Sequence, residues 1–159
     1  MSLRNGLPYK VPISTLIVVY THELLVLLLE RADYPGHWQS VTGSQEPGET
    51  LAQTATRELA EETGIAAGDW GGLDDWHAAR EFEIFARWAH RYRPGTTRNT
   101  EHWFGLALAE PVPVRLEPRE HLRHVWLPWQ EAAAKCFSWT NRDAILQLPQ
   151  HATDHRRPA

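Results

Sequence analysis

The chain has 159 residues, which predicts a single domain over residues 1–150 followed by a frayed polar tail over 151–159. Its composition, 42% hydrophobic and 23% charged, is that of a globular protein, and its formal net charge of −4 argues against a stable nucleic-acid partner. Cys136 is the only cysteine, which excludes an intramolecular disulfide and a cysteine-rich zinc site.

The apolar stretch over residues 11–29 has the composition of a membrane span but not its continuity. Thr21, His22 and Glu23 interrupt it, and each half has only the length of a strand. The N-terminus also lacks the pattern of a signal peptide. We therefore expect a cytoplasmic protein without a membrane partner.

The first predicted elements are strands. Residues 11–20 and 24–29 are rich in Val, Ile and Leu, and the short polar segment between them predicts a β-hairpin in a buried sheet. A third short strand is expected at 38–42, ending at Gly43.

A helix is predicted over residues 50–63, with the clearest boundaries in the chain. Thr50 and Gln53 have the spacing of a capping box, and Gly64 stands where a helix end favours positive φ. Strands are expected next at 79–88, 102–109 and 124–127, and helices at 131–137 and 141–148. This order predicts an α/β protein, an α/β/α sandwich with a central mixed sheet.

Three glutamates of the first predicted helix share one face. Glu58, Glu61 and Glu62 stand at i, i+3 and i+4, whereas the apolar stripe that would pack on the sheet consists of Leu51, Ala55 and Leu59. Clustered carboxylates repel one another, and a hard divalent cation such as Mg²⁺, or Mn²⁺, removes that cost. Because Mg²⁺ usually binds substrate phosphate oxygens as well, the cluster predicts a phosphate-containing substrate.

Residues around the glutamates complete the pattern. Arg57 is expected to face away from Glu58 and to pair with Glu49, which would hold the preceding loop on the helix. Gly43 and Gly48 allow that loop to fold tightly, so that the Gly43 carbonyl can turn toward the metal.

A charged helix face is usually only a solvated surface, but here the full spacing of the motif favours a metal site over that alternative. It reads Gly, five residues, Glu, seven residues, Arg-Glu-apolar, one residue, Glu-Glu, one residue, Gly-apolar, over residues 43–65. Such a pattern arises by chance on the order of 10⁻⁷ times per chain of this length. At these residues the sequence resembles the Nudix hydrolase family.

The resemblance implies the sandwich fold and the hydrolysis of a diphosphate linkage. It also implies that Glu58 and Glu62 are the principal metal ligands, that Glu61 is a third ligand or the base that activates water, and that Glu49 is a support. The family often adds a distant carboxylate. Glu120 is the candidate, Glu117 is its competitor, and a plain surface acid is the alternative.

Further stretches, at 38–44, 82–85, 91–101, 103–104 and 138–142, resemble the family members that hydrolyse dihydroneopterin triphosphate. This likeness, over about residues 9–148, implies cationic side chains near the phosphates and a stacking wall for a pterin, with Glu83 or backbone groups at the ring edge. The implied substrate residues are Lys10, Arg31, Thr42, Phe82, Glu83, Ile84, Phe85 and Ser138. Ordinary core or surface roles are the alternative for each.

Two other functions fit the same motif. One is hydrolysis of nucleoside triphosphates or dinucleotide polyphosphates, because guanine and a pterin share a similar hydrogen-bonding edge. The other is a catalytically silent ligand-binding domain, which would be expected to have lost glutamates that this chain keeps. None of the nine histidines shows zinc spacing, so none is assigned to a metal.

Overall fold

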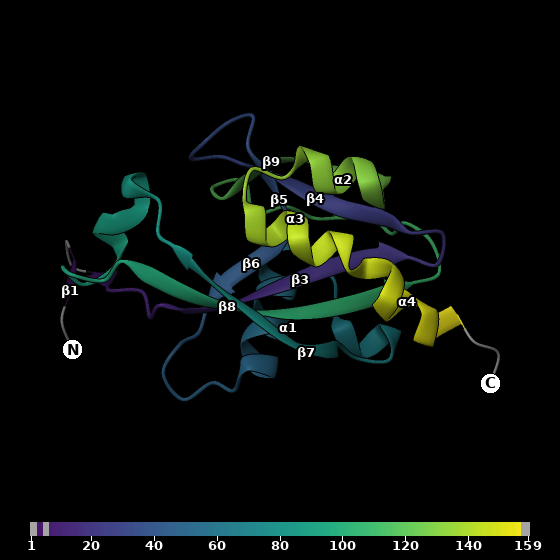
Figure 1. Cartoon of the computed structure of the whole chain (residues 1–159), viewed down its shortest axis with the longest axis horizontal. Coiled ribbons are helices and arrows are strands. Elements are labelled where there is room, and N and C mark those ends of the chain that lie inside the picture. The colour runs from purple at the N-terminus through teal and green to yellow at the C-terminus, as the bar shows by residue number, and fades with distance from the viewer. Residues whose placement is uncertain (1–2, 5–6, 157–159) are drawn as a thin grey trace.

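A seven-stranded mixed sheet lies at the centre of the structure, a computed structural model that describes residues 3–4 and 7–156 (Figure 1). Strands β3 and β8 run parallel, and the other paired strands run antiparallel. The bounds are β3 (Ile13–Thr21), β4 (Leu25–Arg31), β5 (Trp38–Gln39), β6 (Val41–Ser44), β7 (Asp74–Glu83), β8 (Arg98–Leu108) and β9 (His121–Pro128). A separate two-stranded sheet joins β1 (Leu3–Arg4) and β2 (Leu7–Pro8).

The predicted hairpin of β3 and β4 forms only beside its turn. The two strands pair at Tyr20 and Val26, after which β3 pairs with β6 and β4 pairs with β5 and β9. The sheet therefore opens into two arms, and β6 lies along the inner side of one of them. This opening makes room for the site described below.

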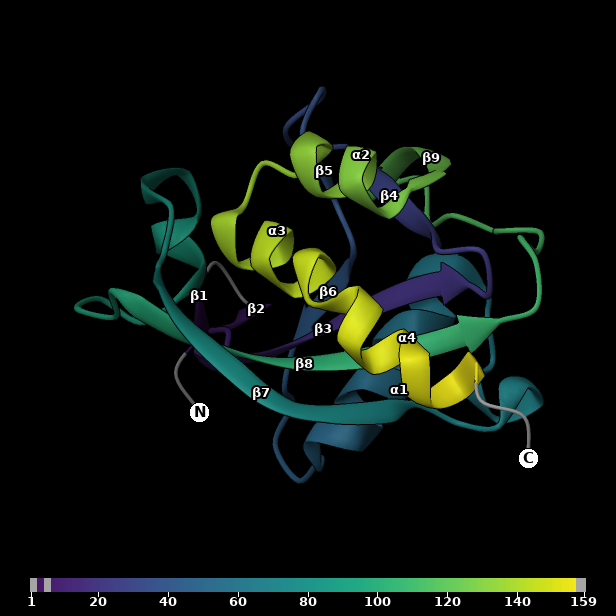
Figure 2. The ribbon, with the colours of Figure 1, turned by 45° about the vertical axis from the view of Figure 1, so that its right-hand side comes forward.

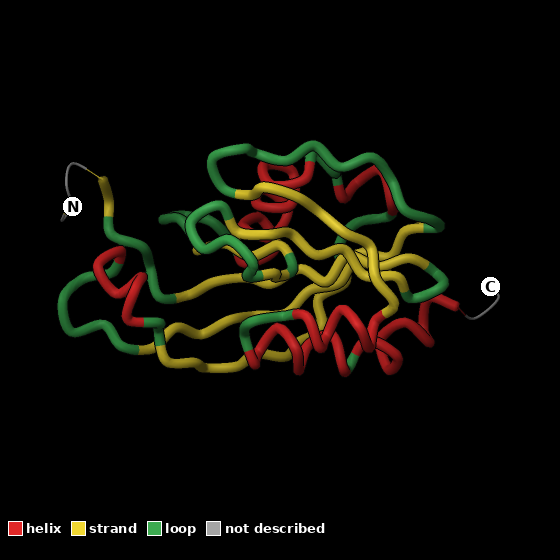
Figure 3. The backbone as a smooth tube through the Cα atoms, turned by 90° about the horizontal axis from the view of Figure 1, so that it is seen from above, coloured by secondary structure: helices red, strands yellow, loops and turns green. Residues whose placement is uncertain are grey.

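Helices cover both faces of the sheet (Figures 2 and 3). On one face lie α1 (Leu51–Thr63) and the 3₁₀ helix η1 (Ala67–Trp70), and on the other lie α2 (Trp129–Lys135), α3 (Trp139–Leu146) and α4 (Leu148–Arg156). The expected α/β/α sandwich with a mixed sheet is confirmed. None of the helices in the described residues is long and apolar enough to cross a membrane.

Alternation along β3 explains the two layers. Leu16 and Val18 face the core beneath α2, α3 and α4, whereas Ile17 and Val19 face the core beneath α1. All four side chains are buried, as a strand covered on both sides requires.

Helix α1 has the predicted ends. The Thr50 hydroxyl accepts a hydrogen bond from the Gln53 amide, and the Gln53 side chain accepts one from the Thr50 amide. Gly64 closes the helix in the left-handed conformation, with φ of 75°. Ala55 and Leu59 are fully buried and Leu51 partly, so the apolar stripe packs on the sheet as predicted.

The strand expected at 79–88 lies earlier in the chain. It begins at Asp74 and ends at Glu83, where its pairing with Arg98 of β8 ends. The polar start, with a register shift between Asp75 and Ala79, does not show the alternation of a strand. The residues after β7 turn into the 3₁₀ helix η2 (Ala86–Arg91) instead of continuing the sheet.

The expectation of a frayed tail from His151 is wrong over most of that segment. The chain forms α4 as far as Arg156, and only residues 157–159 lie outside the described part. The reason is tertiary contact: His151 stacks on Trp76 with ring centroids 4.0 Å apart, and Ala152 is buried. A side chain at Gly105 would overlap the Trp76 indole, so Trp76 lies between β8 and α4.

Candidate active site

The side chain of Glu58 lies against the backbone of Gly43. A Cβ atom at Gly43 would coincide with the Glu58 carboxyl group, so glycine is needed here for space. Positive φ is found instead at Gly48, with φ of 83°. The first glycine of the motif therefore allows α1 to bring its carboxylates up to β6.

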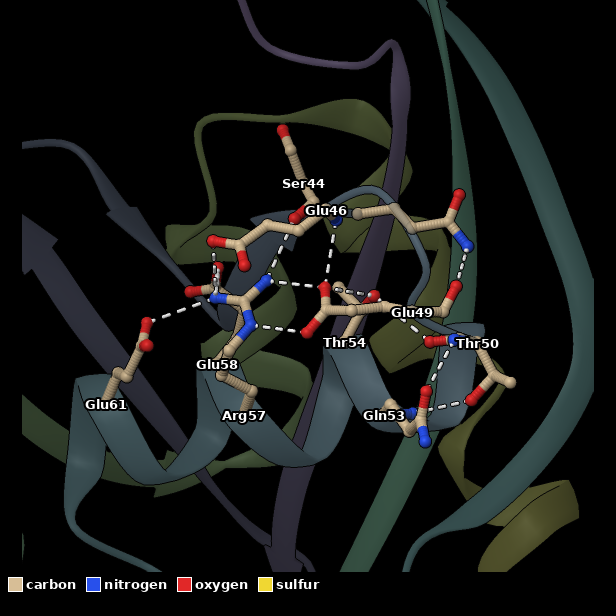
Figure 4. Close-up of polar contacts among 10 residues, drawn as sticks. Ser44, Glu46, Glu49, Thr50, Gln53, Thr54, Arg57, Glu58 and Glu61 are labelled. Carbon is tan, nitrogen blue, oxygen red and sulfur yellow. Dashed lines mark hydrogen bonds and ion pairs between the residues drawn. The ribbon is translucent and has the colours of Figure 1, made fainter. Parts of the chain in front are cut away.

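Arg57 organises the loop before α1 (Figure 4). Its Nε and Nη2 donate to the two carboxylate oxygens of Glu49 at 2.6 and 2.9 Å, and Nη2 also donates to the Ser44 carbonyl at 3.2 Å. Glu49 further accepts hydrogen bonds from the Thr54 hydroxyl and the Glu46 amide. The predicted pairing of Glu49 with Arg57 is present.

The expectation that Arg57 faces away from the acidic face is wrong. Its Nη1 donates to Glu58 at 2.8 Å and to Glu61 at 3.2 Å. The guanidinium reaches both because its long side chain carries a fork of donors well beyond its own Cβ direction. One cation thus contacts three of the motif's carboxylates.

The carboxyl groups of α1 and of the loop before it differ in pKa. Burial raises the pKa of Glu58 to about 7, although the hydrogen bond from Arg57 opposes this. Burial, and then the negative charges of Glu58 and Glu120, raise the pKa of Glu62 well above its usual range. The Arg57 hydrogen bonds lower the pKa of Glu49 to about 2, so that residue stays charged.

These features fit a bound divalent cation. Within the described residues, the buried Oε2 atom of Glu62 has no hydrogen-bond partner. A buried carboxylate without a compensating charge is costly, and an oxygen-binding cation would supply that charge. Glu61 is half exposed and held by Arg57.

A second carboxylate reaches Glu62 from the start of β9. Ligand atoms of Glu62, Glu120 and His121 all lie within 4.8 Å of one another, and the His121 Nε2 atom is 3.6 Å from the Glu62 Oε1 atom. The competitor Glu117 is exposed and does not line the cavity that contains this group.

The sequence motif does not indicate His121 as part of the site. It has no zinc spacing in the sequence, and its one signal was its place directly after Glu120. Burial lowers its pKa to about 4, so the imidazole is neutral and can accept as well as donate.

A cavity of about 1010 Å³ runs from these carboxylates into the opening of the sheet. Of the substrate residues expected from the sequence, Lys10, Arg31, Thr42, Phe82, Ile84, Phe85 and Ser138 line it. Glu83 does not: it points the other way from Phe82 along β7 and lines a smaller neighbouring hollow. Glu83 shares that hollow with Phe82, Ile84, Phe85 and Ser138, so a contact of Glu83 or of backbone groups with a ring edge stays a prediction.

Arg31 is held in place at the cavity wall. It forms two hydrogen bonds of 2.8 Å with Asp33 and one of 3.0 Å with Gln39, and its guanidinium lies 4.2 Å from the centre of the Trp88 ring. Arg91 also donates to Asp33, at 2.8 Å. This places two cations beside the carboxylate end, where an anionic ligand would meet them.

The aromatic wall is larger than expected. Phe85 packs against Trp88 and Phe137, with ring centroids 5.4 and 5.5 Å apart, and all three rings line the cavity. Phe85 is 41% exposed, which leaves a face free for a flat ligand. Trp88 and Phe137 could not be chosen from the sequence, because they stand far apart and outside any motif.

Comparison with known proteins agrees with this architecture. The NUDIX domain family model matches residues 10–148, and the chain belongs to this family. Nudix hydrolases act on small phosphorylated molecules and generally use divalent metal ions. A protein of Escherichia coli (strain K12) named dihydroneopterin triphosphate diphosphatase is 49% identical over 142 residues, or 88% of this chain and 93% of that protein.

A second relative and a solved structure carry names of the same kind. A dihydroneopterin triphosphate diphosphatase of Haemophilus influenzae is 39% identical over 140 residues, or 86% of this chain and 87% of that protein. The solved structure of the E. coli dihydroneopterin triphosphate pyrophosphohydrolase matches with a TM-score of 0.83 and 48% identity, covering 87% of this chain and 95% of that one.

Proposed function

We propose that this chain hydrolyses dihydroneopterin triphosphate to dihydroneopterin monophosphate and pyrophosphate, with Mg²⁺ as the preferred ion. The observation that carries the proposal is that one cavity connects the carboxylates of α1 with an aromatic wall and buried polar side chains. A triphosphate and a flat polar ring need these two surroundings in a single pocket. The names of the relatives favour the same substrate.

Glu58, Glu62 and Glu120 are the proposed metal ligands, with Glu61 as a further ligand or the base and the Gly43 carbonyl as a neighbour. When bound, the ion would neutralise phosphate charge and lower the pKa of the attacking water. Oxygen-only donors suit Mg²⁺, and Mn²⁺ fits the same set. Should His121 also bind, its nitrogen would favour Mn²⁺ more than Mg²⁺.

The remaining residues would hold the substrate. Lys10 and Arg31 would bind the phosphates, and the Thr42 hydroxyl, which donates to the Thr15 carbonyl at 3.0 Å, would lie beside them. Phe82, Ile84 and Phe85 would form the apolar wall for the ring. Arg57 would orient Glu58 and Glu61 without touching the substrate, as their shared hydrogen bonds suggest.

The test is a comparison of substrates with purified protein and Mg²⁺. Pyrophosphate release from dihydroneopterin triphosphate should have a kcat/KM at least about tenfold above that for any common dNTP or for a dinucleotide polyphosphate. Equal or reversed values would replace the proposal with the nucleotide activity. No turnover of any of these compounds, with retained ligand binding, would instead identify a silent binding domain.

A further inference from the structure

The described structure contains a buried carboxyl group that the metal site does not use. Glu101 is the fourth residue of β8, is 5% exposed, and lines the cavity. In the sheet register Glu101 lies opposite Ser14 of β3, and Ser14 lies opposite Ser44 of β6. Two strand spacings therefore separate Glu101 from the loop of the metal site, a distance of about 10 Å.

Glu101 belongs to the face of the sheet opposite the metal-site carboxylates. It shares that face with Trp103, whose indole Nε1 donates to it at 3.1 Å and whose ring belongs to the core under α3. Glu58, in contrast, lies over Gly43 on the α1 face. Because both groups line the same cavity, it reaches from Glu58 to the α3 face at Glu101.

The carboxylate of Glu101 can accept more hydrogen bonds than its neighbours in the structure donate. Besides Trp103, the Thr140 hydroxyl donates to it, and Thr140 is itself 2.9 Å from the Ser138 hydroxyl. A carboxylate has about four lone-pair sites, so roughly two remain for a ligand. Both donors are neutral, and no cation in the described part of the chain pairs with this carboxyl group.

A second acceptor lies on the same face two residues away. Asn99 is 1% exposed, lines the cavity, and donates from Nδ2 to the Ser14 hydroxyl at 2.7 Å. Its Oδ1 atom has no hydrogen-bond partner within the described residues. Buried polar atoms are rarely left unpaired, so an unpaired acceptor beside a spare carboxylate indicates a missing donor-rich ligand.

From this arrangement we propose that Glu101 is the specificity-determining residue of the cavity, where its carboxylate accepts the N3–H and 2-amino hydrogens of a 2-amino-4-oxopyrimidine ring. This inference rests on the proposed function, since a pterin carries that ring. Two adjacent N–H donors match two carboxylate oxygens in a bidentate pair. Asn99 Oδ1 takes a further ring or side-chain donor, and guanine presents the same edge.

The experiment measures binding of two probes, pterin and lumazine, by fluorescence titration of the whole protein. Lumazine carries a carbonyl in place of the 2-amino group. Its carbonyl oxygen and the Glu101 carboxylate are both hydrogen-bond acceptors, so they would repel each other. Wild-type protein should bind pterin at least about tenfold more tightly than lumazine. Equal binding of the two by the wild type overturns the proposal, whatever the variants do.

The variant Glu101→Gln separates recognition from packing. It keeps shape and volume but replaces one acceptor by a donor, so the preference for pterin should shrink to about threefold or less, with KM rather than kcat changed for the triphosphate. Glu110→Gln, an exposed glutamate in the loop after β8, is the matched control and should keep the wild-type ratio. An unchanged ratio in Glu101→Gln, or equal weakening of both probes, contradicts the proposal.

These outcomes are distinct from those of the substrate test. If dihydroneopterin triphosphate is a poor substrate while pterin still binds through Glu101, the proposed function fails and the ring-binding site stands. The hydrolysis of GTP and ITP gives a check within nucleotides, because ITP lacks only the 2-amino group. The ratio of kcat/KM for GTP to kcat/KM for ITP should exceed one in the wild type and fall toward one in Glu101→Gln.

Discussion

Arg57 and Glu49 form a two-pronged ion pair, with Nε to Oε2 at 2.6 Å and Nη2 to Oε1 at 2.9 Å. The pair fixes the loop before α1 to the helix, and it leaves the third nitrogen of the fork, Nη1, directed at Glu58 and Glu61. Arg57 therefore connects the loop geometry to the orientation of the proposed metal ligands.

The substitution Arg57→Lys tests this connection. Lysine keeps the charge but has no planar fork, so it cannot hold Glu49 bidentately and contact Glu58 together. We expect kcat to fall by about 10–100-fold, the usual effect of losing a group that orients metal ligands. Pyrophosphate release under saturating substrate measures it.

Arg142→Lys is the matched control, because Arg142 is exposed on α3 and does not line the cavity. It should retain the wild-type rate. If Arg57→Lys also kept that rate, Arg57 would be a surface cation without influence on the site.

A second prediction concerns Glu62 and the metal. Glu62→Gln removes a buried carboxylate whose pKa is already raised by burial, so the metal-free variant should be at least as stable as the wild type. Turnover should fall by at least about a hundredfold.

Thermal unfolding in EDTA and in Mg²⁺ provides the readout. At an ion concentration 100 times its dissociation constant, binding stabilises the wild type by about 2.7 kcal/mol, and the variant should show little of this gain. Glu131→Gln, an exposed glutamate of α2, should respond to Mg²⁺ as the wild type does. A full Mg²⁺ response in Glu62→Gln would remove Glu62 from the ligand set.

The fold was predictable where the sequence signals are local. Thr50, Gln53 and Gly64 fixed the ends of α1 because capping depends on neighbouring residues alone. Helix α4 was missed because its stability comes from His151 on Trp76 and from buried Ala152, contacts between segments 75 residues apart in the chain. Nothing in the polar sequence of the tail reports such contacts.

The candidate site was likewise predictable only where the sequence signals are local. The spacing of Glu58, Glu61 and Glu62 placed them on one helix, and their common side followed from helix geometry. The sequence does not indicate Glu101 and Asn99 as site residues, because a lone acid or amide in a strand shows nothing of what covers it. Only the sheet register, which sets Glu101 beside Ser14 and under α3, reveals a buried acceptor in the cavity.

The third prediction concerns the pH dependence of stability. Burial raises the pKa of Glu101 to about 7 in the folded chain, although hydrogen bonds from Thr140 and Trp103 oppose it. An acid whose pKa is higher in the folded than in the unfolded chain stabilises the folded state most at low pH. For Glu101 this stabilisation is lost as the pH rises from about 4.5 through about 7. Between pH 5.5 and 8 the wild type should therefore lose about 2 kcal/mol of unfolding free energy through this residue.

Urea unfolding at the two pH values, in EDTA, compares the wild type with Glu101→Gln. The amide does not titrate, so the variant should lose about 2 kcal/mol less than the wild type over the same interval. Other buried acids cancel in this difference, since both proteins carry them. Equal losses would show that Glu101 titrates normally in the folded chain.

The last prediction concerns the anchoring of α4. His151 lies parallel to Trp76, with an interplanar angle of 1° and centroids 4.0 Å apart, and Trp76 is only 6% exposed. Replacing His151 with Ala removes this stack and uncovers part of the indole, so we expect a loss of about 1 kcal/mol. For a chain of this size that loss lowers Tm by about 2–4 °C, which calorimetry measures. Gln150→Ala, an exposed position on the same helix, should change Tm by much less, and equal shifts in the two variants would mean that helix propensity rather than the Trp76 contact holds α4 in place.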